Sequence, residues 1–483
     1  MHYSARTPTN VLRHRRLIMA VWVFCLGLGL GLGCQPKKPT CQAVAPLKEL
    51  GEVYLYAEAF SLSARQLDVD FDAIRVEKAD GTSFNLTTSK IVGKSMARPR
   101  LLAWGRIPPG DYTGVLIKAK RAQIAGSDGP SDLLLTEAVS KRAISFSLRR
   151  RQAVVLYLKA DLGKLLKGVK FTPLFDIRVE SKGSTDIYGY VANSGSQTLT
   201  IFDSRTRRVV RVIPTGRTPR GLAIDRNSGR LYLALSGEDE VEVIDTAAGE
   251  SVKRIRLRPG DRPEEVALSS DGGTLITVNR GSNTASFVDV RSGLEVKRTP
   301  TGEEPTGILV DRNGQRAYIF NRRSNDITVL DITNQATVAT VSSEVEPLRG
   351  QVNREGTRLF VAHRASAYLL AYSLPDLAVV ERVFVGLGMS SIKVDPNTDL
   401  VYVGMEGGEV VRVYDAASLV PVETVDVVAP VDEMTIGAED NTMLFLARDK
   451  QSITFMDLTN RKIVGELKVG CSPYAVGLMK ERR

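Results

Sequence analysis

Arginine recurs at one fixed place in a repeated stretch of this 483-residue chain. Seven aromatic or aliphatic residues stand 42 or 44 residues apart, and the residues that follow each of them by four are Ser194, Ser236, Arg280, Arg322, Arg364, Glu406 and Arg448. Convergent guanidinium groups bind carboxylate or phosphate through paired N–H donors. The pattern therefore predicts capture of an anion by the four arginines, with Arg217 and Arg220 close by in neighbouring loops. The alternative role for these arginines is loop solvation and pairing between repeats.

Catalytic chemistry has few candidates in the sequence. His363 is the single histidine after residue 34, so a metal site with several histidine ligands is excluded from the rest of the chain. A Ser-His-Asp arrangement would depend on His363, which takes the place of Asn193, Asn279 and Asn321 in other repeats and therefore indicates a polar strand end. Neither a glycine-rich phosphate loop nor a Cys-x-x-Cys pair is present. We expect no metal and no cofactor, and we favour a non-catalytic protein.

Short strands must position the arginines. The repeated residues are Tyr190, Tyr232, Ile276, Tyr318, Phe360, Tyr402 and Leu444, and an aspartate follows thirteen residues later in six of the seven repeats. Apolar runs of four to six residues between Asn, Asp and Gly turns are typical of pleated strands. A period of about 40 to 45 residues with four such strands is typical of a propeller blade. The sequence predicts an all-β fold with a seven-bladed propeller over residues 183–483.

The end of the chain predicts how the ring closes. Residues 473–480 repeat the phase of residues 219–225, and no further repeat follows them. Blades that stack in a closed ring protect the edges of their sheets. We therefore expect the strand at 473–480 to pair beside residues 190–193 and to supply the innermost strand of the first blade.

These residues resemble a known family. Tyr190-Val-Ala-Asn, followed by Ile201-Phe-Asp and Ile213-Pro-Thr-Gly-x-x-Pro-x-Gly, is similar to the YVTN-repeat seven-bladed propellers of bacterial and archaeal secreted and surface proteins. The resemblance covers residues 188–483 and rests on the phased repetition. In departures from it, Ser373 replaces the aspartate, and Met389 and Val431 stand where proline is expected. The resemblance implies an architecture more than a chemistry, so it names no ligand.

Residues 1–33 are expected to be an export signal, because three arginines precede an apolar run that ends before Cys34. The segment resembles a bacterial lipoprotein signal, which implies lipidation of Cys34 and a polar tether over residues 34–43. Because Gln35 is not aspartate, the same resemblance implies the outer membrane, on its periplasmic or surface side. The alternatives are an ordinary cleaved signal and a transmembrane anchor.

Two cysteines remain after the signal and the lipidation site, namely Cys41 and Cys471. An exported protein can form a disulfide between them, which would join the tether to the last repeat. Two free thiols or pairs between molecules are the alternative, because spacing along the sequence does not establish that two cysteines lie close together.

Residues 44–182 lack the repeat, and their punctuated apolar runs predict a β-sandwich. Strands are expected at 53–58, 70–77, 101–104, 112–118, 144–148, 154–159 and 175–179. Ile107-Pro-Pro-Gly-Asp-Tyr112 resembles a turn of the immunoglobulin- or prealbumin-like domains in bacterial lipoproteins. Residues 152–162 and Phe171-Thr-Pro173 resemble the closing strands of one such domain of unknown function. The resemblance implies a fold and no activity.

The net charge of +10 is concentrated in this predicted sandwich. Residues 44–182 contain 23 Lys and Arg against 15 Asp and Glu, whereas residues 183–483 contain 36 against 40. An anionic membrane surface would attract the basic region, with about 1 kcal/mol for each well-placed cation. The alternative is a solvated face, and vesicle binding that ignores lipid charge and salt would reject the membrane hypothesis.

We interpret the chain as a lipid-anchored cell-envelope protein with two all-β domains. The leading interpretation is a binding or scaffolding module whose propeller face takes a protein or an anionic small molecule or polymer. One alternative is a propeller hydrolase or lactonase, which a bound divalent metal and loss of activity with His363 would identify. Another, less favoured, is binding of nucleic acid or an acidic glycan, which a steep salt dependence of affinity would identify.

Overall fold

The computed structural model describes residues 50–96, 100–126, 129–136, 139–150, 153–179 and 187–480. The chain divides into two compact units, residues 1–40 and 41–483, and every described residue belongs to the second. The predicted signal at 1–33, the lipidation site Cys34 and the tether at 34–43 lie outside the described residues. No helix in the described ranges is long and apolar enough to cross a bilayer.

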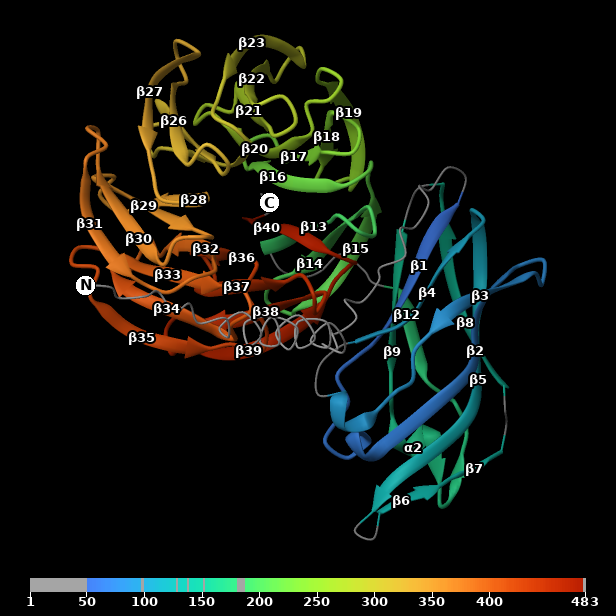
Figure 1. The fold of residues 1–483 in the computed structure, drawn as a ribbon. Helices are drawn as coiled ribbons and strands as arrows, with labels where there is room; N and C mark the ends of the chain where they lie inside the picture. Colours follow the sequence, from blue (N-terminus) through green and yellow to red (C-terminus); the bar gives the residue numbers. More distant parts are fainter. Residues whose placement is uncertain are drawn as a thin grey trace, which may run out of the picture. The chain divides into compact units, whose positions relative to one another are not determined.

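The described residues from 187 to 480 form seven antiparallel four-stranded sheets, which we number blade 1 to blade 7 (Figure 1). Blades 1 to 4 contain β13 Ile187–Asn193, β14 Thr198–Asp203 and β15 Arg208–Pro214 with β40 Pro473–Lys480; β16 Pro219–Asp225, β17 Arg230–Leu235, β18 Glu240–Asp245 and β19 Glu250–Arg256; β20 Pro263–Leu268, β21 Thr274–Asn279, β22 Thr284–Asp289 and β23 Leu294–Pro300; β24 Pro305–Val310, β25 Arg316–Asn321, β26 Asp326–Asp331 and β27 Ala336–Ser342. Blades 5 to 7 contain β28 Pro347–Val352, β29 Arg358–His363, β30 Tyr368–Ser373 and β31 Val379–Phe384; β32 Met389–Val394, β33 Leu400–Met405, β34 Val410–Asp415 and β35 Pro421–Asp426; β36 Glu433–Gly437, β37 Thr442–Ala447, β38 Ser452–Asp457 and β39 Lys462–Lys468.

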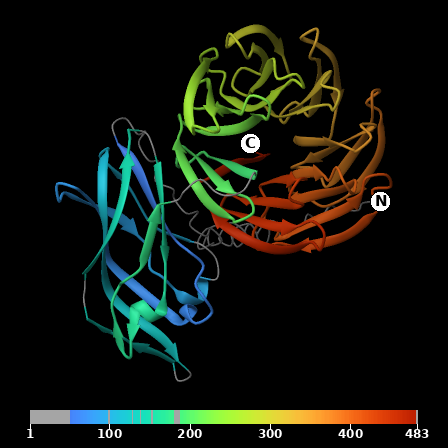
Figure 2. The ribbon, with the colours of Figure 1, turned by 180° about the vertical axis from the view of Figure 1, so that it is seen from behind.

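The propeller closes on itself through the last strand. The inner strands β16, β20, β24, β28, β32, β36 and β40 are neighbours in this order, and β40 also lies beside β16. Figure 1 shows the labelled members of this set around the centre of the ring, and Figure 2 shows the same ring from behind. Strand β40 pairs antiparallel with β13, with Val191 opposite Val476 and Tyr190 opposite Gly477. The predicted seven-bladed propeller, and the predicted closure of its first blade by residues 473–480, are confirmed.

The cores of the propeller lie between neighbouring blades. The second strands of the blades are apolar on both faces, and their repeated residues, such as Tyr232 and Phe360, are buried. Among the described residues, the buried apolar side chains form clusters that each draw on two successive blades. A single four-stranded sheet cannot cover both of its faces, so each blade depends on its neighbours for burial.

The repeated aspartates cap the turns between the third and fourth strands. The side chain of Asp245 accepts hydrogen bonds from the backbone N–H groups of Ala247 and Ala248, at 3.0 and 2.8 Å. Asp289 and Asp331 accept in the same way from the third residue after them. Such Asx turns satisfy backbone donors that the strands leave unpaired. The recurrence of aspartate every 42 residues is therefore explained by turn geometry and not by a metal site.

The described residues from 50 to 179 contain twelve strands and three short helices. Their bounds are β1 Gly51–Ala57, η1 Ala64–Gln66, β2 Leu67–Lys78, β3 Ser83–Thr88, η2 Gly93–Ser95, β4 Arg100–Ile107, β5 Gly110–Gly126, β6 Gly129–Asp132, β7 Leu134–Leu135, β8 Val139–Leu148, β9 Ala153–Lys159, α2 Leu162–Leu165, β10 Leu166–Lys167, β11 Lys170–Phe171 and β12 Asp176–Val179. Each of the seven strands expected in this region overlaps one of them.

Nine of these strands, within the described ranges, form one hydrogen-bonded sheet in the order β12-β9-β1-β4-β3-β2-β5-β6, with β8 paired to β5. Strand β3 joins its two halves, because Leu86 lies opposite Ile74 of β2 and Thr87 lies opposite Trp104 of β4. One buried apolar cluster draws on both halves, so the sheet folds back around a common core. The assignment to the immunoglobulin- or prealbumin-like class stays a prediction.

The Pro-Pro-Gly-Asp-Tyr turn has a clear physical role. The hydroxyl of Tyr112 donates a hydrogen bond to the carbonyl oxygen of Pro108 at 2.6 Å, and the ring of Tyr112 is buried and stacked on Phe146 at 5.1 Å between centroids. The tyrosine therefore fixes the turn between β4 and β5 from within the core. A phenol that is buried with its hydroxyl bonded to the backbone combines apolar burial with a satisfied donor.

Candidate functional site

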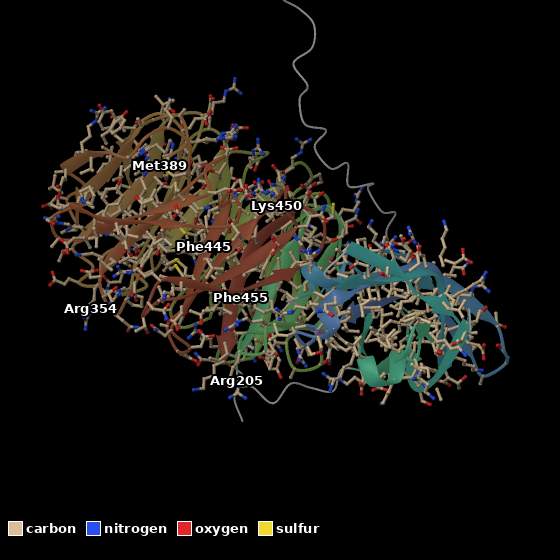
Figure 3. The ribbon with its side chains drawn as sticks, turned by 90° about the horizontal axis from the view of Figure 1, so that it is seen from below. Arg205, Arg354, Met389, Phe445, Lys450 and Phe455 are labelled. Atoms are coloured by element: carbon tan, nitrogen blue, oxygen red, sulfur yellow. The ribbon has the colours of Figure 1, made fainter. Side chains whose placement is uncertain are left out.

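The arginines that the repeat places together surround one cavity of about 180 Å³ in the propeller. Five of the six arginines predicted to bind an anion line it, namely Arg220, Arg280, Arg322, Arg364 and Arg448. The sixth, Arg217, is not part of this lining; its side chain is exposed and lies 3.6 Å from Glu238. The cavity is on the face that carries the loops between second and third strands. In Figure 3 this face includes the labelled Lys450, while Arg205 and Arg354 lie on the opposite face.

A second ring of residues completes the lining. Each of these residues follows the proline of the Gly-x-x-Pro loop, or the residue that replaces it, by one position. They lie on the inner strands, or directly before one, and are Arg220, Glu264, Thr306, Leu348, Ser390, Asp432 and Tyr474. We call the cavity enclosed by these residues and the arginines the cup. The sequence prediction missed this ring apart from Arg220, although the residue after each repeated proline was a signal that could have identified it.

The arginines of the cup are ion-paired, mostly between successive blades. Arg364 makes a two-pronged contact with Glu406, with Nε and Nη2 each 2.9 Å from a carboxylate oxygen. Arg280 and Arg322 both contact Glu304, at 2.6 and 3.1 Å. The alternative role of pairing between repeats is therefore present in the structure. A guanidinium group has five N–H donors, so a bidentate carboxylate leaves donors that can contact a ligand.

An ion cluster crosses the propeller axis beneath the cup. The Nη2 atom of Arg349 lies 3.2 Å from Glu265 and 2.9 Å from Glu433, and these three residues come from blades 5, 3 and 7. Contacts between three blades that are not neighbours in the ring require the side chains to meet near the axis. We call Glu265, Arg349 and Glu433 the floor, because they close the channel below the cup. The sequence prediction missed all three.

Glu265 of the floor has a raised pKa. Burial raises the pKa of Glu265 to about 7; the nearby Arg349 lowers it and the nearby Glu433 raises it. The contacts with Arg349 lie within ion-pair distance, but one oxygen of Glu265 and one of Glu433 lack a hydrogen-bond partner among the described residues. Desolvation that hydrogen bonds do not offset favours the neutral acid. Glu265 therefore changes charge near neutral pH.

Tyr474 connects the wall of the cup to its acidic side. Its hydroxyl donates to Glu264 at 2.6 Å, and the guanidinium carbons of Arg220 and Arg448 lie 4.5 and 5.3 Å from its ring centroid. Burial, together with the nearby Glu264 and Glu265, raises the pKa of Tyr474 well above its usual value. The phenol therefore stays protonated and serves as a donor and a cation–π surface, not as a base or nucleophile.

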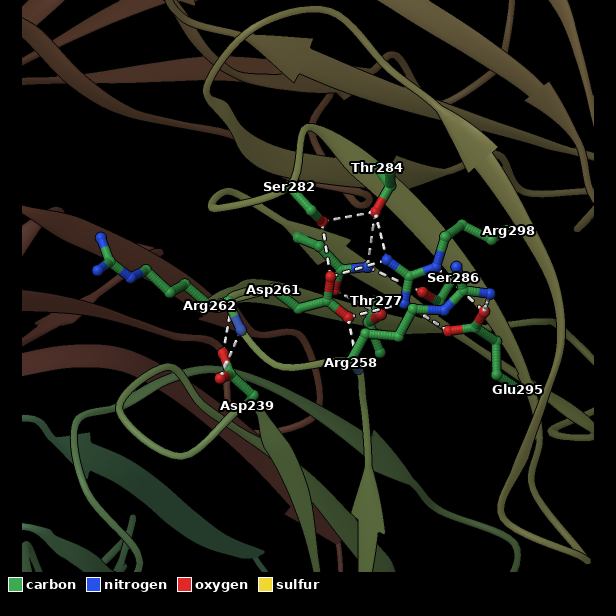
Figure 4. Close-up of polar contacts among 12 residues, drawn as sticks. Asp239, Arg258, Asp261, Arg262, Thr277, Ser282, Thr284, Ser286, Glu295 and Arg298 are labelled. Carbon is green, nitrogen blue, oxygen red and sulfur yellow. Dashed lines mark hydrogen bonds and ion pairs between the residues drawn. The ribbon is translucent and has the colours of Figure 1, made fainter.

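A buried hydrogen-bond network holds the loop between blades 2 and 3, at the open end of the cup, which we call its mouth (Figure 4). Arg298 donates to both carboxylate oxygens of Asp261 at 2.7 Å, and Ser282 and the backbone N–H of Arg258 donate to the same group. Burial opposes ionisation of Asp261, but these hydrogen bonds outweigh it and place its pKa below the usual range. The backbone carbonyl of Asp261 accepts from Gly281, the residue after Arg280. The network therefore fixes the loop that carries one arginine of the cup.

His363 is a strand-end residue, as its place in the repeat predicts. Its Nε2 atom lies 2.8 Å from the hydroxyl of Ser343, and its Nδ1 atom lies 3.1 Å from the carbonyl oxygen of Tyr368. The carbonyl requires Nδ1 to carry the proton, so Nε2 is the acceptor. Burial lowers the pKa of His363 to about 4. Both ring nitrogens are occupied, and His363 is not among the residues that line the cup.

Replacing His363 with asparagine should change the pH dependence of stability. An unfolded histidine binds a proton near pH 6.5 and the folded one near pH 4, so the unfolded state holds more protons between these values. This contribution to stability is complete above pH 6.5 and is lost as the pH falls, up to about 3 kcal/mol. We expect urea unfolding between pH 7 and pH 4.5 to show a flatter curve for H363N than for the original chain. Parallel curves would contradict the assignment.

Metal binding has no obvious centre in the described part of the chain. Among the described residues, no group of three or more His, Cys, Asp or Glu side chains is arranged to hold a metal ion. Cys471 is disulfide-bonded, and the predicted partner Cys41 lies outside the described residues, so the pairing stays a prediction.

Comparisons with known proteins address the fold. Residues 198–394 match the model of the YNCE-like β-propeller family. No curated protein sequence matches the chain. A functionally unknown protein from Desulfotomaculum acetoxidans DSM 771 is similar in structure, with a TM-score of 0.55, 14% sequence identity, and coverage of 61% of this chain and 99% of that one.

Two further solved structures are similar at lower scores. Hydrazine synthase of Kuenenia stuttgartiensis has a TM-score of 0.48 and 16% identity over 53% of this chain and 87% of that chain. The dihydro-heme d1 dehydrogenase NirN, in complex with DHE, has a TM-score of 0.48 and 12% identity over 60% of this chain and 74% of that chain. Sequence identities this low carry a fold and no activity. The comparisons and the strand topology together identify the chain as an all-β protein that contains a β-propeller.

Proposed function

We propose that the propeller is a non-catalytic binding module whose cup holds an anionic group of its ligand, either a carboxylate or a phosphate. The observation that carries the proposal is the convergence of arginines on one cavity. Among the described residues, six arginines line the cup against three carboxylates, those of Glu264, Glu406 and Asp432. Glu304, Glu265 and Glu433 pair with three of these arginines from outside the lining, so the attraction comes from guanidinium donors that converge on a concave, partly desolvated wall and not from a large net charge. Guanidinium forks also match carboxylate and phosphate oxygens in geometry.

The dimensions of the cup favour an end group over a polymer. The cup has a volume of about 180 Å³ and the floor lies across the axis below it, while a wider cavity of about 540 Å³ adjoins it and shares Arg220, Glu264 and Arg280. A nucleic acid or an acidic glycan would present a continuous backbone, which would have to pass the ion cluster on the axis. These two ligand classes are therefore favoured less than a small anion or the charged end of a larger molecule.

A hydrolase or lactonase is also favoured less. The mechanism suggested by sequence requires His363, whose ring nitrogens both contact other groups inside blade 5 and its neighbour. Tyr474 is held in its protonated form, which removes it as a general base. The groups that face the cup can hold and orient an anion. Neither His363 nor Tyr474 supplies an activated nucleophile.

Reversing two charges of the cup should abolish anion capture. Inorganic phosphate and succinate are the probes, and their binding is measured by isothermal titration calorimetry. R280E/R364E places two carboxylates beside Glu304 and Glu406, so we expect the dissociation constant of each bound probe to rise at least tenfold.

The matched control is R205E/R354E, which makes the same change in net charge on the exposed opposite face (Figure 3). Binding to this control should equal binding to the original chain, and thermal unfolding should show both variants folded. Capture of neither probe by the original chain, or equal loss in the two variants, would contradict the proposal.

The propeller operates from a lipid anchor in the cell envelope, attached at Cys34 and directed to the outer membrane. The lipoprotein-like signal supports this, and so does the basic composition of residues 44–182. Part of that charge is balanced within the region, where Arg121 and Lys164 pair with Asp132 and Asp176. Two anchoring contributions, acyl chains and basic residues, give more stable attachment than either alone.

Cys34→Ser should release the protein from the membrane. We expect the variant in the soluble fraction of fractionated cells, without incorporation of labelled palmitate, while the original chain sediments with membranes and is labelled. Cys471→Ser is the matched control, because it removes a cysteine elsewhere and should leave labelling unchanged. Labelling of the Cys34 variant would exclude this residue as the lipidation site.

A further inference from the structure

Successive loops at the mouth of the cup carry exposed apolar side chains. The loops between blades 4 and 5, 5 and 6, and 6 and 7 present Val345, Leu387 and Val428, which are 49, 69 and 48% exposed. Phe384, the last residue of β31, is 66% exposed beside the second of these loops. We call these four residues the apolar arc. Val345 and Leu387 each stand two residues before the repeated proline or its replacement. In other loops of the same face, residues such as Arg217 and Glu303 occupy this position.

The apolar arc adjoins the arginines of the cup. Gly388, next to Leu387, accepts a hydrogen bond from the backbone of Glu406 and donates one to the backbone of Arg364, at 2.6 and 3.1 Å. The carbonyl of the residue after Val345 accepts from the N–H of Arg364 at 2.9 Å. Val345 and Leu387 therefore flank the ion pair of Arg364 with Glu406, which lines the cup.

The arc coincides with departures from the repeat. Met389 and Val431 replace the expected prolines in two of its three loops, and both side chains are buried where the prolines of other blades lie. The fold is therefore preserved without the motif, and the exposed Leu387 and Val428 add nothing to the core. Exposed apolar residues on successive loops at the edge of a charged cavity favour a contact surface.

We propose that the cup and the apolar arc together bind the C-terminal end of another protein chain. The inference rests on the proposed function and names its ligand: a free α-carboxylate in the cup, preceded by apolar side chains on the arc. The floor permits an end and not a passing chain, and the arginines match the charge of a carboxylate. The apolar spots are separated by the polar loops of Arg364 and Glu406, which suits side chains spaced along a peptide better than a continuous alkyl chain.

A synthetic peptide library tests the proposal. Hexapeptides with randomised sequences and free C-termini, and the same peptides as C-terminal amides, are probed with the full chain by fluorescence anisotropy. We expect the bound members to need the free carboxylate and to carry Leu, Ile, Val or Phe within their last three positions. V345S/L387S should weaken these members about tenfold and abolish the apolar preference, because serine removes the contact without changing charge.

The matched control is V252S/V338S, which replaces two equally exposed valines at the starts of the outer strands β19 and β27, away from the mouth. This variant should bind as the original chain does. Binding of amides as tight as that of acids, or an unchanged apolar preference in V345S/L387S, overturns the inference. If phosphate and succinate bind and R280E/R364E loses them while no peptide binds, the proposed function stands and the peptide assignment fails. Decanoate that binds when no peptide does would identify an alkyl carboxylate as the occupant.

Discussion

A chain that ends at Ser472 should lose the cooperative unfolding transition of the propeller. The deletion removes β40, the inner strand of blade 1, and with it the buried side chains of Tyr474, Val476, Leu478 and Met479. Burial of one large apolar side chain contributes about 1.5–3 kcal/mol, so the loss is at least about 6 kcal/mol. This is comparable to the total stability of a typical domain, roughly 5–15 kcal/mol. Near-ultraviolet circular dichroism and thermal unfolding measure the result.

The control is a chain that ends at Lys480, which keeps the whole of β40. It should unfold within a few degrees of the full chain. If the chain that ends at Ser472 retains a sharp transition at a similar temperature, then closure by β40 contributes little, and the ring must be held by contacts between the remaining blades.

Arg349→Met should destabilise the propeller by about 3 kcal/mol at pH 8, since it removes the partner of Glu265 and leaves Glu433 with Lys393 alone, 3.7 Å away, in a largely desolvated site. The side chains of Glu265 and Glu433 are 10 and 5% exposed, whereas Arg349 is 23% exposed toward the cup, which places the effect at the lower end of the range for buried pairs. The pKa of Glu265, about 7, adds a pH dependence. At pH 5.5 the group is neutral in the folded protein with or without Arg349, so the penalty should be smaller than at pH 8.

The variant R349M/E265L/E433L shows whether R349M destabilises the propeller through loss of the ion pairs or through loss of side-chain packing. Removing both carboxylates should restore most of the stability, because buried ion clusters can be replaced by apolar groups at little cost. Chemical unfolding at pH 5.5 and pH 8 compares the two variants with the original chain. A triple variant as unstable as R349M, at both pH values, would show that the packing of Arg349 matters and its charge does not.

The phase of the repeat predicted the arrangement of the arginines. A residue four positions after a repeated aromatic falls at the same place in every blade, so rotation about the axis brings Arg280, Arg322, Arg364 and Arg448 into one wall. Arg217 lies outside this lining, in a different kind of loop, where its side chain is 3.6 Å from Glu238. Repeat phase fixes where a backbone lies, but the direction of a long side chain depends on the carboxylates around it.

The floor could have been found by the same reasoning but was not. Glu265, Arg349 and Glu433 stand 84 residues apart, which is two repeats, and each follows the expected proline by two. The phase predicts that they share a level of the channel. It does not predict that an arginine of blade 5 reaches blades 3 and 7, because contact across the axis depends on side-chain length and on small residues such as Gly221 and Gly307 at the same level.

The strands between residues 50 and 179 were predicted less completely, because this region has no internal repeat whose copies can be compared. The seven expected strands are present, but β3 and shorter strands such as β6 and β7 were missed; Ser83–Thr88 of β3 is mostly polar and lacks a clear apolar run. Its place in the sheet comes from pairing with β2 and β4. Register with two neighbours is a tertiary property that a local pattern of residues does not contain.

Pairing of β40 with β13 also sets the order of assembly during synthesis. A ribosome releases β13 to β15 about 260 residues before it releases the strand that completes their sheet. Until then the first blade exposes an unpaired edge, and the ring stays open however many blades have formed. The propeller therefore cannot finish folding before its last segment has been made.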